Sequence, residues 1–233
     1  MADVVTTSAA EVARRLERVR ARIQDAGGDA DRVRLVAVTK GFDVSVVCAA
    51  MDAGLVDLGE SYAQELVRKV AQLDELRDIP TCRPRWHFVG RLQRNKVKKI
   101  APHVAEWQSV DRLDLGAEIA RRAPGAAVLV QVHLTGEPTK GGCPPAELPA
   151  LLEGLDDLGL DVRGLMTIGP HGPPDLARPV FHELRVLADR YRLPERSMGM
   201  SQDLEMAIAE GATTVRLGSA LFGPRPNKLG VPN

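Results

Sequence analysis

The sequence is poor in cysteine and carries no excess of charge of either sign. Its three cysteines, Cys48, Cys82 and Cys143, are odd in number and far apart, and no Cys-x-x-Cys pair occurs. This spacing argues against a disulfide framework and against a cysteine-ligated zinc site. Lys and Arg together number 31, as do Asp and Glu, so the formal net charge is zero. A balanced charge argues against a general binder of nucleic acids or membrane surfaces.

Long hydrophobic runs and targeting signals are also missing. No run of about 18 apolar residues occurs, so no transmembrane helix is expected. The N-terminal segment has no basic stretch followed by an apolar one, so we predict no signal peptide and a cytoplasmic location. The five histidines show neither His-x-His nor His-Glu-x-x-His spacing. We therefore predict no metal site.

The 233 residues instead show an alternation of short apolar strands and amphipathic helices. A helix comes first, because Ser8 and Glu11 form a capping-box pattern and the following apolar residues recur at helical spacing up to Gly27. Eight strand-helix units follow it, and most of them begin with a short apolar segment. The predicted strands are residues 34–39, 56–59, 86–90, 107–110, 128–134, 162–168, 197–198 and 214–217.

Eight such units favour a closed α/β barrel. Near-continuous apolar strands with intervening helices indicate a parallel sheet that is covered on both faces. A doubly wound open sheet is the alternative, but it would require a glycine-rich phosphate turn after the first strand, and Lys40-Gly41-Phe42 is not one. We predict a single (β/α)8 TIM-barrel domain over residues 1–233, with an extra N-terminal helix in residues 1–30 and a loose tail in residues 224–233.

A lysine follows the first strand, at the end of the barrel where active sites of this fold lie. Lys40 comes after the apolar segment Val36-Ala-Val-Thr39. An amine at a barrel mouth with apolar walls would have a lowered pKa, and its neutral form could form a Schiff base with an aldehyde. The alternative is a lysine whose stem lies on the strand end and whose charge reaches solvent.

The last two strand ends carry groups suited to an anion. Gly218 and Ser219 follow the eighth strand and open a short helix, and Ser201 follows the seventh strand. Backbone amides and hydroxyls at such positions bind phosphate groups, although simple turns and helix caps use the same residues. Because the eighth strand adjoins the first in a closed barrel, a phosphate near Gly218 and an aldehyde at Lys40 describe one ligand, pyridoxal 5′-phosphate (PLP).

Arg216 lies two residues before Gly218 and is predicted to face the same interior. An arginine opposite the pyridine nitrogen of PLP keeps that nitrogen unprotonated, so the ring withdraws electrons weakly. An internal salt bridge of Arg216 with Glu60 or Glu205 is the alternative.

Seven segments resemble the YggS/PROSC family of pyridoxal phosphate homeostasis proteins, which have the barrel fold of the alanine racemase N-terminal domain. They occur in the family's order over nearly the whole chain. The segments are Val36-Ala-Val-Thr-Lys40, Leu58-Gly-Glu-Ser-Tyr62, Trp86-His-Phe-Val-Gly-Arg-Leu-Gln-Arg-Asn-Lys96, Ser109-Val-Asp-Arg112, Gly164-Leu-Met-Thr-Ile-Gly169, Ser197-Met-Gly-Met-Ser-Gln-Asp-Leu-Glu205 and Val215-Arg-Leu-Gly-Ser-Ala-Leu-Phe-Gly223.

The resemblance implies that Lys40 holds PLP as an internal aldimine. It also implies that Ser201, Gly218 and Ser219 hold the phosphate and that Arg216 faces the ring nitrogen. The chain departs from the family's pattern at two positions. Phe42 replaces a second lysine that members often carry, and Ser61 replaces the usual asparagine after Gly-Glu.

We therefore expect a PLP-binding protein that stores or delivers its cofactor with little turnover, and we assign no catalytic residue. PLP-dependent apo-enzymes are the expected recipients, nucleic acid and membrane are not expected partners, and a monomer is the expected state. A PLP-dependent amino-acid racemase is the alternative. It needs a second base, and the chain has only Tyr62 and Tyr191 as tyrosines and ten residues after Gly223, too few for a second domain. A cofactor-free Schiff-base aldolase would leave Arg216 unexplained.

Overall fold

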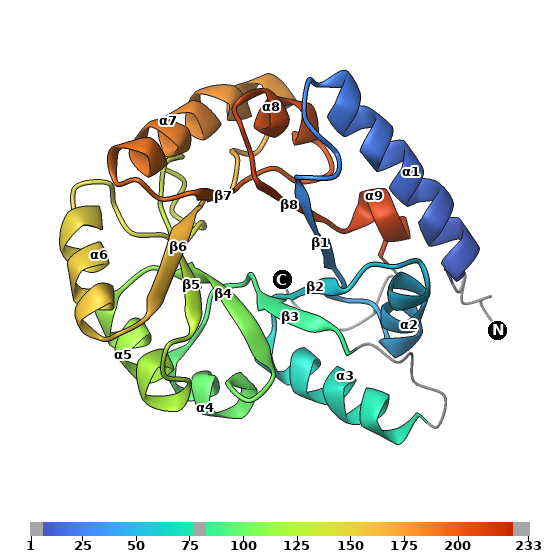
Figure 1. Cartoon of the computed structure of the whole chain (residues 1–233), viewed down its shortest axis with the longest axis horizontal. Coiled ribbons are helices and arrows are strands. Elements are labelled where there is room, and N and C mark those ends of the chain that lie inside the picture. The colour runs from blue at the N-terminus through green and yellow to red at the C-terminus, as the bar shows by residue number, and fades with distance from the viewer. Residues whose placement is uncertain (1–6, 77–82, 226–233) are drawn as a thin grey trace.

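The computed structural model describes residues 7–76 and 83–225. Eight parallel strands pair in chain order and close into a barrel, with helices around the outside (Figure 1). The closure is direct, because β1 pairs with both β2 and β8. The predicted (β/α)8 barrel is therefore confirmed, and the open-sheet alternative is wrong.

The strands lie close to their predicted positions. β1 was predicted to reach residue 39 but ends at Val38, and β4 begins three residues before its predicted start. The strands are β1 (Arg34–Val38), β2 (Asp57–Glu60), β3 (Arg85–Phe88), β4 (Val104–Val110), β5 (Ala127–Gln131), β6 (Asp161–Met166), β7 (Glu195–Ser197) and β8 (Thr214–Leu217).

A helix follows each strand, and these helices surround the sheet with an apolar side turned inward. In α5, for example, the buried residues Leu115, Gly116 and Ile119 recur at helical spacing. The helices are α1 (Ala9–Asp25), α2 (Val44–Asp52), α3 (Ala63–Glu75), η1 (Arg94–Lys96), α4 (Val97–Ile100), α5 (Leu113–Arg122), α6 (Leu148–Asp157), η2 (Pro174–Leu176), α7 (Ala177–Arg190), α8 (Leu204–Ala209) and α9 (Ser219–Phe222).

Helix α1 is additional to the eight strand-helix units. Its N-terminus is capped as predicted, because the Oγ of Ser8 accepts a hydrogen bond from the amide of Glu11 at 3.2 Å. Its buried face consists of the predicted apolar residues and packs against α2, α8 and α9 (Figure 1). The buried residues are Val12, Leu16, Val19 and Ile23. The helix thereby covers the seam where β8 meets β1.

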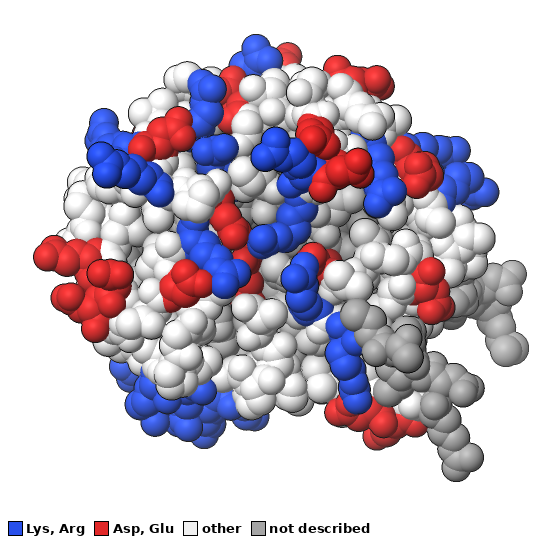
Figure 2. All heavy atoms as spheres, viewed as in Figure 1, with Lys and Arg blue, Asp and Glu red and all other residues white. Residues whose placement is uncertain are grey.

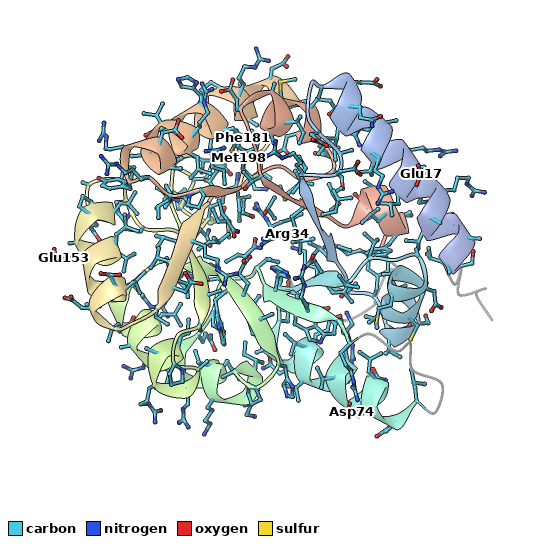
Figure 3. The ribbon with its side chains drawn as sticks, viewed as in Figure 1. Glu17, Arg34, Asp74, Glu153, Phe181 and Met198 are labelled. Carbon is cyan, nitrogen blue, oxygen red and sulfur yellow. The ribbon has the colours of Figure 1, made fainter. Side chains whose placement is uncertain are left out.

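The amino-terminal half of the barrel interior is polar. Figure 3 labels Arg34 near the centre of the ring of strands. Its guanidinium contacts Glu106 at 3.1 Å and Glu195 at 3.2 Å, and His87 lies between Glu106 and Asp57. Lys, Arg, Asp and Glu accordingly intermingle at the middle of the face seen in Figure 2. Charged pairs fill the space that branched apolar side chains fill in many barrels.

The imidazole of His87 is the centre of this network. Its Nε2 lies 2.8 Å from Asp57 Oδ1 and its Nδ1 lies 3.0 Å from Glu106 Oε1. Burial opposes a charge on the ring, but the hydrogen bonds to both carboxylates outweigh burial and raise the pKa of His87. The ring is therefore an imidazolium over a wider pH range than a free histidine.

Two further predictions concern the surface and the tail. Helix α4 buries Val97 and Ile100 and exposes Lys98 and Lys99, so this basic segment is a solvated helix face. No helix within residues 7–76 and 83–225 is both long and apolar enough to span a membrane. Of the tail predicted for residues 224–233, only Pro224 and Arg225 are described, and the rest lies outside the described residues.

Candidate ligand-binding site

A pocket of about 310 Å³ opens at the carboxyl ends of the strands. This volume falls within the range of about 300–1,000 Å³ typical of small-molecule sites. The pocket is formed by loops from several different units of the barrel. Its lining includes all five residues predicted to contact a ligand, namely Lys40, Ser201, Arg216, Gly218 and Ser219. Barrel closure thus brings together residues that lie at opposite ends of the sequence.

Lys40 lies in the turn that follows β1, two residues after the strand ends. The side chain is half-buried and lines the pocket. Its Nζ makes no hydrogen bond or ion pair with any residue of the described chain. Burial, followed by the charges of Arg225 and Arg216, lowers the pKa of Lys40. A lowered pKa increases the fraction of neutral amine at neutral pH, and only the neutral amine is a nucleophile.

The turn around Lys40 is held by a buried lysine on α3. Lys69 has no exposed side-chain surface, and its Nζ donates a hydrogen bond to the carbonyl oxygen of Thr39 at 2.7 Å. The same Nζ forms an ion pair with the buried carboxylate of Glu60. Thr39 also donates through Oγ1 to Glu60 at 2.7 Å. The residue before Lys40 is therefore fixed through both its backbone and its side chain.

The residue after Lys40 is held from the same helix. Glu65 accepts a hydrogen bond from the amide of Gly41 at 2.8 Å and lies 3.3 Å from the Nζ of Lys69. Gly41 has a φ of +79°, a conformation that favours glycine. Lys69 was not among the residues predicted from the sequence. The only signal was the i,i+4 spacing of Glu65 and Lys69.

Arg216 lies on β8 and is buried beneath the pocket. It donates to Ser197 Oγ and to the carbonyl oxygen of Thr167, both at 2.7 Å. Burial lowers the pKa of Arg216 to about 10, so the guanidinium is still a cation at neutral pH. A guanidinium has five N–H donors. These two bonds leave donors that can reach a ligand.

The predicted alternative for Arg216, a salt bridge, is wrong. Glu60 is paired with Lys69, and Glu205 contacts Arg22 at 2.6 Å. No carboxylate within the described segments forms an ion pair with Arg216. The described hydrogen bonds of Arg216 go to neutral groups, and the charge of Asp203 only partly offsets the effect of burial.

Ser201, Gly218 and Ser219 bring the last two loops of the barrel together. Ser201 Oγ accepts a hydrogen bond from the amide of Ala220 at 3.1 Å, which links the loop after β7 to α9. Gly218 precedes α9, and a Cβ at this position would lie 3.3 Å from the carbonyl oxygen of Val38. The glycine therefore allows β8 and β1 to approach closely beside the pocket.

A second lysine lines the pocket, but its amine is engaged. Lys140 Nζ donates to Glu137 at 2.8 Å and to the carbonyl oxygen of Gly169 at 2.5 Å. His171 contacts the other carboxylate oxygen of Glu137 at 2.5 Å. The hydrogen bonds from Lys140 and His171 lower the pKa of Glu137 to about 2. Lys140 was not among the residues predicted from the sequence, because nothing in its local pattern places it at the pocket.

The two departures from the family pattern lie at or near the pocket. Ser61 is one of the lining residues. Phe42 is buried and packs edge-on against Phe222, with ring centroids 5.6 Å apart. The aromatic pair connects the turn of Lys40 to α9 at the position where many members carry a second lysine.

Comparisons with known proteins agree with this geometry. Residues 10–226 match the family described as alanine racemase, N-terminal domain. A Pseudomonas aeruginosa protein named pyridoxal phosphate homeostasis protein is 42% identical, with 95% of this chain and 97% of that protein covered. The Aquifex aeolicus protein of the same name is 40% identical, with 92% and 96% covered.

Solved structures show the same relationship. The structure of PipY from Synechococcus elongatus with PLP bound superposes with a TM-score of 0.77 at 34% identity, covering 91% of this chain and 100% of that one. Alanine racemase from Streptomyces coelicolor shares the fold, with a TM-score of 0.69 at 19% identity, and 59% of that chain is covered. The chain therefore belongs to the family of pyridoxal phosphate homeostasis proteins, which share the fold of the alanine racemase N-terminal domain.

Proposed function

We propose that this protein binds PLP in the pocket at the barrel mouth and acts in PLP homeostasis, by storing or delivering the cofactor with little or no turnover. The observation that carries the proposal is the amine of Lys40, which lines the same pocket as Arg216 and has a lowered pKa and no described partner. The relatives named pyridoxal phosphate homeostasis protein, and the PipY structure with PLP bound, support the choice of ligand.

Lys40 is the residue proposed to bind the cofactor covalently. Its neutral Nζ would hold the cofactor through a C=N bond to the aldehyde carbon, with the loss of one water molecule. The lowered pKa favours this step because it increases the neutral fraction of the amine. Lys69 and Lys140 are less suited to the step, since Glu60 and Glu137 pair with their ammonium groups.

The other four residues are proposed to hold the remaining polar groups of PLP. Ser201, Gly218 and Ser219 would bind the phosphate through hydroxyl and backbone N–H groups. Arg216 would face the pyridine nitrogen. A guanidinium, which cannot accept a proton, keeps this nitrogen unprotonated and the ring a weak electron sink. That property supports storage or delivery over amino-acid turnover.

The racemase alternative lacks a tyrosine base among the described residues that line the pocket. Tyr62 is 60% exposed, and Tyr191 ends α7, on the side of the barrel opposite the pocket. A racemase would need such a base on the face of the planar ring opposite to the lysine.

The test is a visible absorption spectrum of the purified protein after incubation with PLP and removal of unbound PLP, beside Lys40→Ala and the exposed control Lys98→Ala. We expect a yellow band that borohydride removes in the wild type and in Lys98→Ala, and no such band in Lys40→Ala. A protein that stays colourless after PLP is added would contradict the proposal. If the band appears, incubation with amino acids and with a PLP-dependent apo-enzyme separates racemization from delivery.

The cellular setting is part of the same proposal. We propose a single-domain monomer in the cytoplasm that passes PLP to apo-enzymes. Light scattering of the loaded protein and cell fractionation test these statements. A stable dimer, or recovery in a membrane or secreted fraction, would contradict them.

A further inference from the structure

Helix α1 is bonded to the loop that carries Ser201, although it lies outside the eight repeats. Arg22 Nη2 donates to the carbonyl oxygen of Ser201 at 3.1 Å. The same guanidinium binds both carboxylate oxygens of Glu205, at 2.6 and 2.9 Å. Glu205 lies on α8, directly after this loop. One side chain of α1 therefore holds both the loop and the helix that follows it.

The N-terminal part of the chain is also bonded to the end of α9. Arg15 Nη1 donates to the carbonyl oxygen of Leu221 at 3.3 Å, and Thr7 Oγ1 donates to that of Phe222 at 3.1 Å. Ser201 Oγ, in turn, accepts from the amide of Ala220. Helix α1, the loop of Ser201 and α9 thus form one connected unit around the proposed phosphate position.

The bond from Arg22 is suited to orienting the loop. A guanidinium that binds a carboxylate through two N–H groups has a fixed plane, so its third contact is directional. The hydrogen bond from Arg22 lowers the pKa of Glu205, so the pair stays charged at neutral pH. The described lining of the pocket does not include Arg22. Arg22 therefore does not contact a ligand in the pocket, and its hydrogen bond reaches the pocket through the backbone of Ser201.

We propose that Arg22 is a positioning residue for phosphate recognition: by fixing the backbone of Ser201 from outside the barrel, it orients the loop that binds the phosphate group of the ligand. The proposal rests on the proposed function, because it takes Ser201 as a phosphate contact. It adds that α1 is part of the binding machinery. It also predicts that Arg22 matters for phosphorylated ligands and much less for the same ring without its phosphate.

The test compares two ligands on matched variants. Absorbance titrations give the dissociation constants of PLP and of pyridoxal, which has the aldehyde and ring but no phosphate. The variants are Arg22→Met, Glu205→Gln and the control Arg18→Met, an exposed arginine of the same helix. Inorganic phosphate serves as a competitor of PLP, and a urea unfolding curve confirms that each variant is folded.

Arg22→Met is expected to weaken PLP binding by about tenfold, the order of effect of one charge-assisted hydrogen bond, and to raise the phosphate concentration needed for competition. Pyridoxal affinity should change by less than about twofold, and Arg18→Met should match the wild type for both ligands. Glu205→Gln should act in the same direction with a smaller effect. This variant keeps the test available if Arg22→Met does not fold.

Three results would overturn the inference. An unchanged affinity for PLP in Arg22→Met and Glu205→Gln would show that the loop needs no support from α1. An equal loss for PLP and pyridoxal would show a general structural effect. A wild type that binds PLP no more tightly than pyridoxal, and with no competition from phosphate, would instead overturn the phosphate assignment within the proposed function.

Discussion

Lys69→Met is the substitution for which the structure predicts the largest loss of stability. The ammonium of Lys69 and the carboxylate of Glu60 are both wholly buried. Methionine keeps most of the volume but removes the hydrogen bond to Thr39 and the contacts to Glu60 and Glu65. Removing one partner of a buried pair typically costs about 3–5 kcal/mol, because the remaining charge has lost its compensation. A domain of this size is stable by about 5–15 kcal/mol, so the loss is large.

The assay is urea unfolding of Lys69→Met beside the exposed control Lys98→Met, which should stay within about 0.5 kcal/mol of the wild type. A second variant, Lys69→Met with Glu60→Gln, removes the charge that Lys69→Met leaves unpaired. We expect it to recover part of the loss. A loss below about 1 kcal/mol for Lys69→Met, or no recovery in the double variant, would refute the reasoning.

The same reasoning predicts a pH dependence. Burial already raises the pKa of Glu60 above its ordinary value of 4.5, and Lys69 opposes that rise. Without Lys69 the folded-state pKa rises further, while the unfolded-state pKa is unchanged. When the pKa of a group is higher in the folded state than in the unfolded state, the group contributes most stability below its unfolded-state pKa. That contribution is lost as the pH rises through the folded-state pKa. The deficit of Lys69→Met should therefore be smaller near pH 4 than near pH 8.

Two further predictions follow from the barrel interior and its packing. The hydrogen bonds to Asp57 and Glu106 raise the folded-state pKa of His87 above its ordinary value of 6.5. The stability that protonated His87 contributes is therefore fully present below the unfolded-state pKa and is lost as pH rises through the folded-state pKa. Urea midpoints measured from pH 6 to 9 should fall more in the wild type than in His87→Gln, and equal slopes would contradict this. Gly164→Ala should destabilise the folded protein by roughly 1–3 kcal/mol, because the added Cβ would lie 2.0 Å from the carbonyl oxygen of Glu195. An unchanged thermal midpoint would show that β6 and β7 separate easily.

The strands that were hardest to predict are those with charged interior residues. β4 starts at Val104 and not at residue 107, because Glu106 interrupts the apolar pattern while its side chain enters the polar network of the barrel. β7 was difficult to predict for the same reason, because it contains the charged residue Glu195, whose side chain pairs with Arg34. Apolar periodicity detects residues that avoid water. It does not detect a buried ion, whose partner lies elsewhere in the sequence.

Local sequence patterns were sufficient to predict the eight strand-helix units, the capped helix α1 and the residues that follow each strand. These features depend on local patterns, such as apolar spacing and the Ser8 cap. The order of units and the parallel closure then place Lys40 beside Gly218 without further information. The pocket residues could be predicted to this extent because barrel topology assigns all strand ends to one face.

The pairing of the charged groups became evident from the folded barrel and could not be read from local patterns. Lys69 binds the turn of Lys40 from 30 residues away along the chain, and Arg22 reaches Ser201 across 179 residues. Long charged side chains have several possible partners at similar cost, and the choice depends on which donors and acceptors are buried together once the barrel has closed. The positions of the groups that line the pocket are therefore fixed by contacts that no local pattern encodes.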